Sequence, residues 1–248
     1  MNRHLSMRTA NPALQSDTFR KAMSGSTSDF GVMTINGVVS KTGLSLLLLV
    51  ISASLTWSNP ALSWLGMFGT FAGLLLAIIT IFKPTISHLT VPAYAIMQGL
   101  VLGLISRIFE NQYPGIAVQA IFLTFGTLGS LLLAYMSGLI KATENFKLGI
   151  FAATGAIGIL YLINFVMSFF GTGIGVIHSN STMGIVFSIG VVIIAALNLV
   201  LDFDFIEEGA EIGAPKYMEW YATFGLLVTL IWLYIEILRL LSKLNSRR

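Results

Sequence analysis

Long apolar stretches separated by short polar turns set the pattern of this chain. After a polar first segment, seven such stretches follow one another, and each is continuous rather than alternating in polarity. Continuous apolar runs of about 20 residues predict transmembrane helices, whereas the strands of a membrane β-barrel alternate apolar and polar positions. We therefore expect an all-α integral membrane protein with seven transmembrane helices. The expected spans are 44–57, 62–82, 91–109, 116–140, 148–170, 183–201 and 220–241.

The segment ahead of the first apolar stretch is polar and basic. It lacks the apolar core of a signal peptide, and two parts follow: a polar basic N-terminal arm, 1–40, and a seven-helix transmembrane domain, 41–248. The stretch 44–57 is short for a hydrocarbon core of about 30 Å unless 35–39 extends it and Lys41 snorkels to the interface. The basic residues ahead of Leu44 are Arg3, Arg8, Arg20, Lys21 and Lys41.

Composition supports a lipid environment and disfavours catalysis. Hydrophobic residues are 55% of the chain and charged residues 10%, whereas a soluble domain carries about 25% charged residues. The absence of cysteine excludes disulfides, thiol catalysis and Cys-based metal sites. The histidines His4, His88 and His178 are scattered, no nucleophile–base set is apparent, and we expect neither an enzyme nor a cofactor. The pair Gly99 and Gly103 is interpreted as a helix-packing motif.

The placement of basic residues predicts a cytoplasmic N-terminus. With seven spans and the N-terminus inside, the inside segments hold the arm, Lys83, Lys141, Lys147 and Lys216, as the positive-inside rule requires. The outside loops hold only Arg107, but the basic C-terminal tail would also fall outside, so the side of the C-terminus stays open. We interpret the arm as a topology signal that also contacts anionic lipid heads, rather than as a nucleic-acid binding site.

Acidic residues gather after the sixth apolar stretch. If the helix continues past Leu201, Asp204, Glu208 and Glu211 share one helical face; if it ends there, they form a solvated acidic loop. Phe203, Phe205 and Ile206 are interleaved with the acids and favour a continuing helix. Six of the 11 acids in the chain lie in this window: Asp202, Asp204, Glu207, Glu208, Glu211 and Glu219.

Glu236 lies inside the last apolar stretch, 226–241. A carboxylate there costs a few kcal/mol or more unless it is protonated, paired or facing water, so an ionisable group at this position suggests function. The sequence is compatible with two different partners for the Glu236 carboxylate. Arg239, three residues later, would make an ion pair that ties the end of the helix, whereas a second carboxylate sharing a proton would titrate with Glu236 as one unit.

Several segments of the chain resemble the Bax inhibitor-1 (TMBIM) family, and most of all its bacterial YccA-like branch with a long N-terminal arm. The resemblance covers nearly the whole chain. The segments that carry it are LDFDFIEEGAE (201–211), PKYMEWY (215–221), LYIEIL (233–238), RTANP (8–12), MTING (33–37) and NQYPGI (111–116).

The resemblance implies a fold and an activity. The fold has seven helices with the last one central and six around it, and the activity is a pH-sensitive calcium leak across the bacterial inner membrane. Asp202 and Glu236 match the proton-sharing, ion-sensing carboxylate pair, which would also be the calcium ligands; Asp204, Glu208 and Arg239 are secondary candidates. Glu236 replaces the usual Asp, the second span has no acid, and Gln98 stands where this branch often has Glu.

The geometry of this pair and the function both have alternatives. Glu236 lies 17 residues after Glu219, or about 25 Å along a helix, so it meets Asp202 only if span six is long and span seven is displaced along its axis. The leading hypothesis is a pH-sensitive calcium or cation leak. The alternative is a non-transporting regulator that binds a membrane quality-control protease or another membrane protein. A proton-coupled carrier is less favoured, because no inverted repeat is apparent.

Overall fold

A computed structural model describes residues 31–247, and they form a bundle of helices. Seven of these helices are long and apolar enough to cross a membrane, which confirms the all-α multi-pass fold for the described part of the chain. The long helices are α2 (Ile35–Ser58), α3 (Ser63–Phe82), α4 (Ser87–Gln112), α5 (Ile116–Met136), α6 (Glu144–Ser168), α8 (Thr182–Glu211) and α9 (Met218–Asn245), and the short ones are α7 (Gly175–His178), η1 (Pro60–Leu62) and η2 (Pro84–Ile86).

Helix α2 begins earlier than its apolar core. Thr34 has extended backbone angles, and its side chain accepts a hydrogen bond from the Gly37 N–H, which satisfies one of the free donors of the first turn. Residues 35–40, which the sequence analysis placed in the arm, therefore belong to α2. Its 24 residues span about 36 Å, enough to cross the hydrocarbon core. Residues 1–30 lie outside the described residues, so the arm itself stays a prediction.

Helix α8 continues through the acidic window. It runs for 30 residues from its cap at Ser181, whose side chain accepts from the Gly184 N–H, and it ends only at Glu211. The alternative of a solvated acidic loop is therefore wrong for Asp202 to Glu211. Gly213, with φ of +65°, then supplies the left-handed turn that leads into α9.

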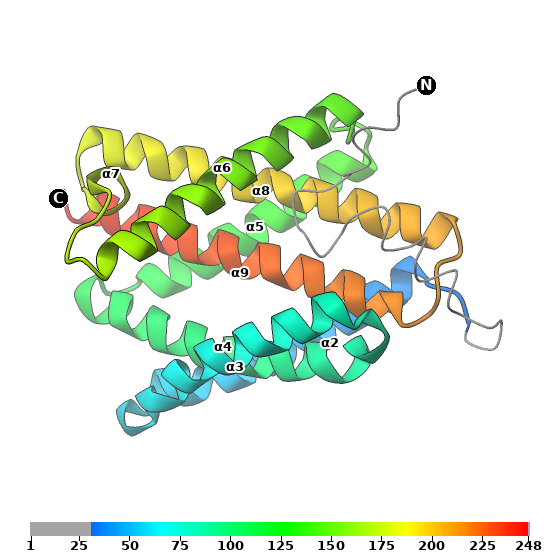
Figure 1. The fold of residues 1–248 in the computed structure, drawn as a ribbon, viewed down its shortest axis with the longest axis horizontal. Helices are drawn as coiled ribbons and strands as arrows, with labels where there is room; N and C mark the ends of the chain where they lie inside the picture. The colour runs from blue at the N-terminus through cyan, green and yellow to red at the C-terminus, as the bar shows by residue number, and fades with distance from the viewer. Residues whose placement is uncertain (1–30, 248) are drawn as a thin grey trace.

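Helix α9 is central, as the resemblance implies (Figure 1). It packs against α2, α4, α5 and α8, and 67% of its membrane-crossing part is buried, against 6% for α6. The other helices do not form a single ring around it. Helix α3 packs mainly on α4 and α6 mainly on α8, so these two lie on the outside of the bundle.

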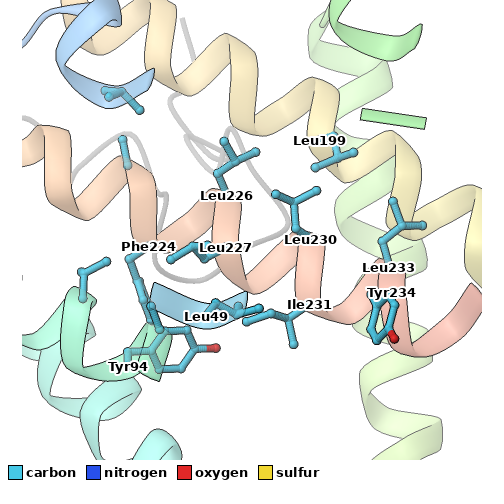
Figure 2. Close-up of a cluster of buried hydrophobic side chains, with 14 of the residues drawn as sticks. Leu49, Tyr94, Leu199, Phe224, Leu226, Leu227, Leu230, Ile231, Leu233 and Tyr234 are labelled. Carbon is cyan, nitrogen blue, oxygen red and sulfur yellow. The ribbon is translucent and has the colours of Figure 1, made fainter. Parts of the chain in front are cut away.

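The core forms where α9 packs against α2, α4, α5 and α8. Figure 2 shows leucines of α9 lying between Leu199 of α8 and Leu49 of α2. Near the start of α9, the Phe224 ring meets the Tyr94 ring of α4 edge to face, with centroids 5.0 Å apart. Such aromatic pairs add about 1 kcal/mol beyond the apolar area they bury.

Small residues let α2 and α4 approach closely. A Cβ atom at Gly99 would lie 2.0 Å from Ser52 Oγ, and one at Gly103 would lie 2.1 Å from the Ala53 carbonyl oxygen. Both distances are far inside van der Waals contact. The interpretation of Gly99 and Gly103 as a packing motif is thus confirmed, with α2 as the partner helix.

The two ends of the bundle are defined by contacts between loops. At one end, here called the N-terminal end, Met33 N donates to Ala214 O at 2.7 Å and Lys216 N donates to Gly31 O at 2.8 Å. The chain therefore enters α2 beside the turn between α8 and α9. At the opposite end, where the C-terminus lies (Figure 1), Arg247 Nε donates to Asn180 O at 2.8 Å.

Candidate functional site

Asp202 is a buried carboxyl group inside a membrane-crossing helix. Its residue is 1% exposed, and it lies nine residues before the end of α8, or about 14 Å along the axis. Neither Oδ1 nor Oδ2 forms a hydrogen bond of normal geometry with another described residue. The Thr229 hydroxyl of α9 faces this carboxyl group as its polar neighbour. A buried polar group left without a partner is uncommon and points to a functional role.

Glu236 has partners on two helices. Its carboxylate accepts from Arg239 Nη1 at 2.8 and 3.0 Å and from the Tyr161 hydroxyl of α6 at 2.9 Å. Arg239 Nη1 also donates to the Tyr161 oxygen at 2.7 Å. Of the two partners considered from the sequence, Arg239 is the one that the structure shows, and Tyr161 is a third group that the sequence analysis did not name.

The structure does not bring Asp202 and Glu236 together. Helices α8 and α9 run antiparallel after a short turn, and two contacts fix their register: Asp202 faces Thr229, and Lys243 Nζ donates to Ser188 Oγ at 2.9 Å. Glu236 lies seven residues beyond Thr229, or about 10 Å along α9. The axial displacement of the last helix, on which a contact between these two residues depends, does not occur. The shared proton and the joint calcium site of this pair are therefore absent from this arrangement.

Two of the three secondary candidates, Asp204 and Glu208, lie in the last turns of α8, at the N-terminal end of the bundle, and the third, Arg239, lies on α9. Asp204 forms a salt bridge of 2.6 Å with Lys147 of α6, whose side chain is buried. The next acid along, Glu207, accepts a hydrogen bond from the Tyr135 hydroxyl of α5. Glu208 is half-buried one turn beyond Asp204 on the same helix. Asp204 and Glu207 thus contact α6 and α5 rather than Asp202.

A polar seam joins α6 to the bundle. Three polar residues of α6 are spaced seven apart, so they share one face, and each contacts α8 or α9. Besides the two contacts already given, Asn198 Nδ2 of α8 donates to Thr154 Oγ1 at 2.8 Å. An apolar cluster around Ile150 of α6 and Leu201 of α8 packs beside these polar contacts. The seam consists of Lys147, Asp204, Thr154, Asn198, Tyr161, Glu236 and Arg239.

Glu219 is a buried carboxylate whose role the sequence analysis missed. It pairs with Lys41 and Lys216, the latter at 3.1 Å, and accepts from Thr34 N at 3.0 Å and Thr34 Oγ1 at 2.9 Å. Lys41 was expected to snorkel toward the membrane surface; it turns inward instead, because an unpaired Glu219 would be costly to bury. At Gly37 a Cβ atom would lie 2.1 Å from Glu219 Oε1, so a residue without a side chain makes room for the carboxylate.

The basic tail is tied into the bundle. Lys243 Nζ donates to Gly184 O at 3.0 Å as well as to Ser188, and Arg247 Nη2 donates to Thr182 Oγ1 at 3.0 Å. These cations are therefore packing groups at the C-terminal end.

A metal site of ordinary composition is not found in the described part of the chain: residues 31–247 contain no group of three or more His, Asp or Glu side chains placed to hold one ion. A permeant cation would have to be bound by single carboxylates, backbone carbonyls and water. Asp202 is a buried carboxyl group whose two oxygens have no hydrogen-bond partner among the described residues.

Comparison with known proteins places the chain in a family. The family model described as Bax inhibitor 1 like matches residues 11–246, which is nearly the whole sequence. No curated protein and no solved structure matches it. The central last helix and the helical acidic segment agree with what the resemblance of 201–238 implied. The chain therefore belongs to the Bax inhibitor 1 like family.

Proposed function

We propose that this protein is a pH-sensitive leak for cations, calcium first among them, in the bacterial inner membrane, with its N-terminus in the cytoplasm. The observation that carries the proposal is Asp202, a carboxyl group with both oxygens unpartnered in the interior of a membrane-crossing helix. Polar groups at such depth are expensive and mark ion or proton pathways by default. Membership of the Bax inhibitor 1 like family supports the same activity.

Competition between a proton and a metal ion at Asp202 supplies the pH sensitivity. With its proton, the carboxyl group is neutral and is compatible with the closely packed α8–α9 contact. Without it, the carboxylate needs a cation or water beside it, and α8 and α9 must separate to admit them. Low pH therefore favours the closed bundle, and the leak rises as pH rises.

The route to Asp202 starts at the C-terminal end of α8, which lies at the N-terminal end of the bundle. The acids there create a negative surface that raises the local concentration of cations. Helix α6 is the element that moves at least cost, because it is held by the polar seam and buries little apolar surface. Water replaces polar contacts of this kind more readily than it replaces an apolar core.

The experiment is calcium flux into liposomes that contain the purified protein, measured against protein-free liposomes at several pH values. A leak that exceeds the empty liposomes and grows from acid to neutral pH is the expected result. A protein that is folded and inserted but passes no calcium at any pH contradicts the proposal.

One observation favours a second candidate function, a non-transporting regulator that binds another membrane protein. Glu236 is already neutralised by Arg239 and Asp204 by Lys147, so neither carboxylate is left to attract a cation. Flux separates the two functions. A regulator gives none, and replacing Asp202 with Asn then changes only its association with the partner.

A further inference from the structure

A cavity of about 920 Å³ lies between α2 and α5 at the N-terminal end of the bundle. Its walls come from α2, α5, the 138–143 loop and the last turns of α8, and Leu226 of α9 forms part of the floor. Along α2 it extends from Ile35 to Leu46, or about 16 Å. That length is close to half of a hydrocarbon core of about 30 Å, so the cavity has the depth of one leaflet.

The cavity is open toward lipid on its apolar side. Val39 on α2 and Leu132 and Met136 on α5 line it and are exposed, so they form an apolar rim that faces the bilayer. Gly43 also lines it, and a Cβ atom there would meet nothing within 4 Å. The space is therefore accessible to an acyl chain that enters sideways from the leaflet.

The lining of the cavity includes one cation and two carboxylates, Lys141, Asp204 and Glu207. Lys141 and Glu207 both line it, and no ion pair joins either of them to another residue within 31–247. Among the described residues, the neutral Tyr135 hydroxyl is the hydrogen-bond donor to Glu207, while Asp204 is already neutralised by Lys147. The mouth thus offers a separate anion and a separate cation above an apolar space.

We propose that this cavity is a binding site for a zwitterionic phospholipid with an ammonium-bearing head. One acyl chain fills the space between α2 and α5, the ammonium group pairs with Glu207, and the phosphate pairs with Lys141. A lipid that carries only the phosphate charge satisfies Lys141 but leaves Glu207 without a counter-ion, so it binds less well. Asp202 does not line this cavity, so the binding of the lipid does not require it.

A second cavity of about 410 Å³ continues the same interface beyond Leu46 toward the C-terminal end. It is lined by apolar residues and a few hydroxyl groups, without a charged side chain. It therefore gives no basis for choosing a head group, and the proposal is confined to the larger cavity.

The test measures which lipid stays with the protein. The full chain is reconstituted in vesicles of phosphatidylethanolamine and phosphatidylglycerol in equal amounts and extracted in mild detergent, and the retained lipids are counted by mass spectrometry. We expect about one phosphatidylethanolamine per chain, in line with one cavity of leaflet depth. Retention of neither lipid, or preferential retention of phosphatidylglycerol, overturns the proposal.

Two variants and a matched control locate the site. Gly43→Leu fills the cavity and should lose most of the retained lipid, while Glu207→Gln should lose the preference for the ammonium head. Gly155→Leu on α6 is the control, because a Cβ atom there also meets nothing within 4 Å. A Gly43→Leu protein that elutes as a folded species and retains as much phosphatidylethanolamine as Gly155→Leu contradicts the assignment.

Discussion

Replacing Glu236 with Gln separates an ion-pair role from a proton-sharing role. The carboxylate is buried and bound by Arg239 and Tyr161, so the change leaves Arg239 without its counter-ion. Removing one partner of a buried pair costs about 3–5 kcal/mol. The Arg239 side chain is 31% exposed and regains some water, and the amide keeps part of the hydrogen bonding. We therefore expect a loss of about 2–3 kcal/mol.

The assay is thermal unfolding of the purified variants in one detergent, followed by circular dichroism. For a chain of this length the expected loss lowers Tm by about 4–12 °C. Glu144→Gln is the control, since the Glu144 side chain is 69% exposed and its contact with Lys147 is long, at 4.0 Å. Neutralising both partners, in Glu236→Gln with Arg239→Gln, should recover part of the loss, because no unpaired charge remains.

The Glu236–Arg239 ion pair also predicts that one property, the pH dependence of flux, stays unchanged. If Arg239 is its partner, Glu236→Gln keeps the pH dependence of any calcium flux, although the protein is less stable. A variant as stable as Glu144→Gln that has lost its pH dependence would refute the ion-pair account and restore the proton-sharing hypothesis.

Three further predictions concern the packing of α2 on α4, the anchoring of the N-terminal segment and the topology. Gly99→Leu should separate α2 from α4 and lower Tm by several degrees, because its Cβ would lie 2.2 Å from the Leu49 carbonyl oxygen. Gly126→Leu is the control and should keep the wild-type Tm, because a Cβ atom there lies in open space. Equal Tm values for the two variants would contradict the packing role of Gly99. Glu219→Ala should release the N-terminal segment from α9, so that a cysteine at Met33 becomes reactive to a water-soluble maleimide; continued protection would argue against Glu219 as its anchor. A cysteine at Ser6 should react only after cells are opened, and labelling of intact cells would reverse the proposed topology.

The membrane-crossing helices could be predicted from the sequence because their signal is local. A continuous apolar run fixes each span, and the aromatic residues between the acids of 201–211 already favoured a continuing helix. Helix ends were harder to predict, since they depend on caps such as Thr34, which lies before the apolar run. The predicted start of α2 was late for this reason.

The partners of the charged residues could not be read from the sequence. Lys41 and Glu219 are 178 residues apart, and their contact exists only because α2 packs beside the start of α9. The same holds for Lys147 and Asp204, on helices whose neighbours the sequence does not specify. The seven-residue spacing of Lys147, Thr154 and Tyr161 was visible, but each residue alone is an ordinary polar group in an apolar helix.

The most direct test of the central claim is the pH dependence of calcium flux in wild-type protein and in Asp202→Asn, with Glu144→Gln as the control. In liposomes between about pH 5 and 8, wild type and Glu144→Gln should leak more as pH rises. Asp202→Asn should leak little and equally at every pH, because it has neither a proton to lose nor a charge to offer a cation. An Asp202→Asn protein with the flux and pH profile of wild type would contradict the account.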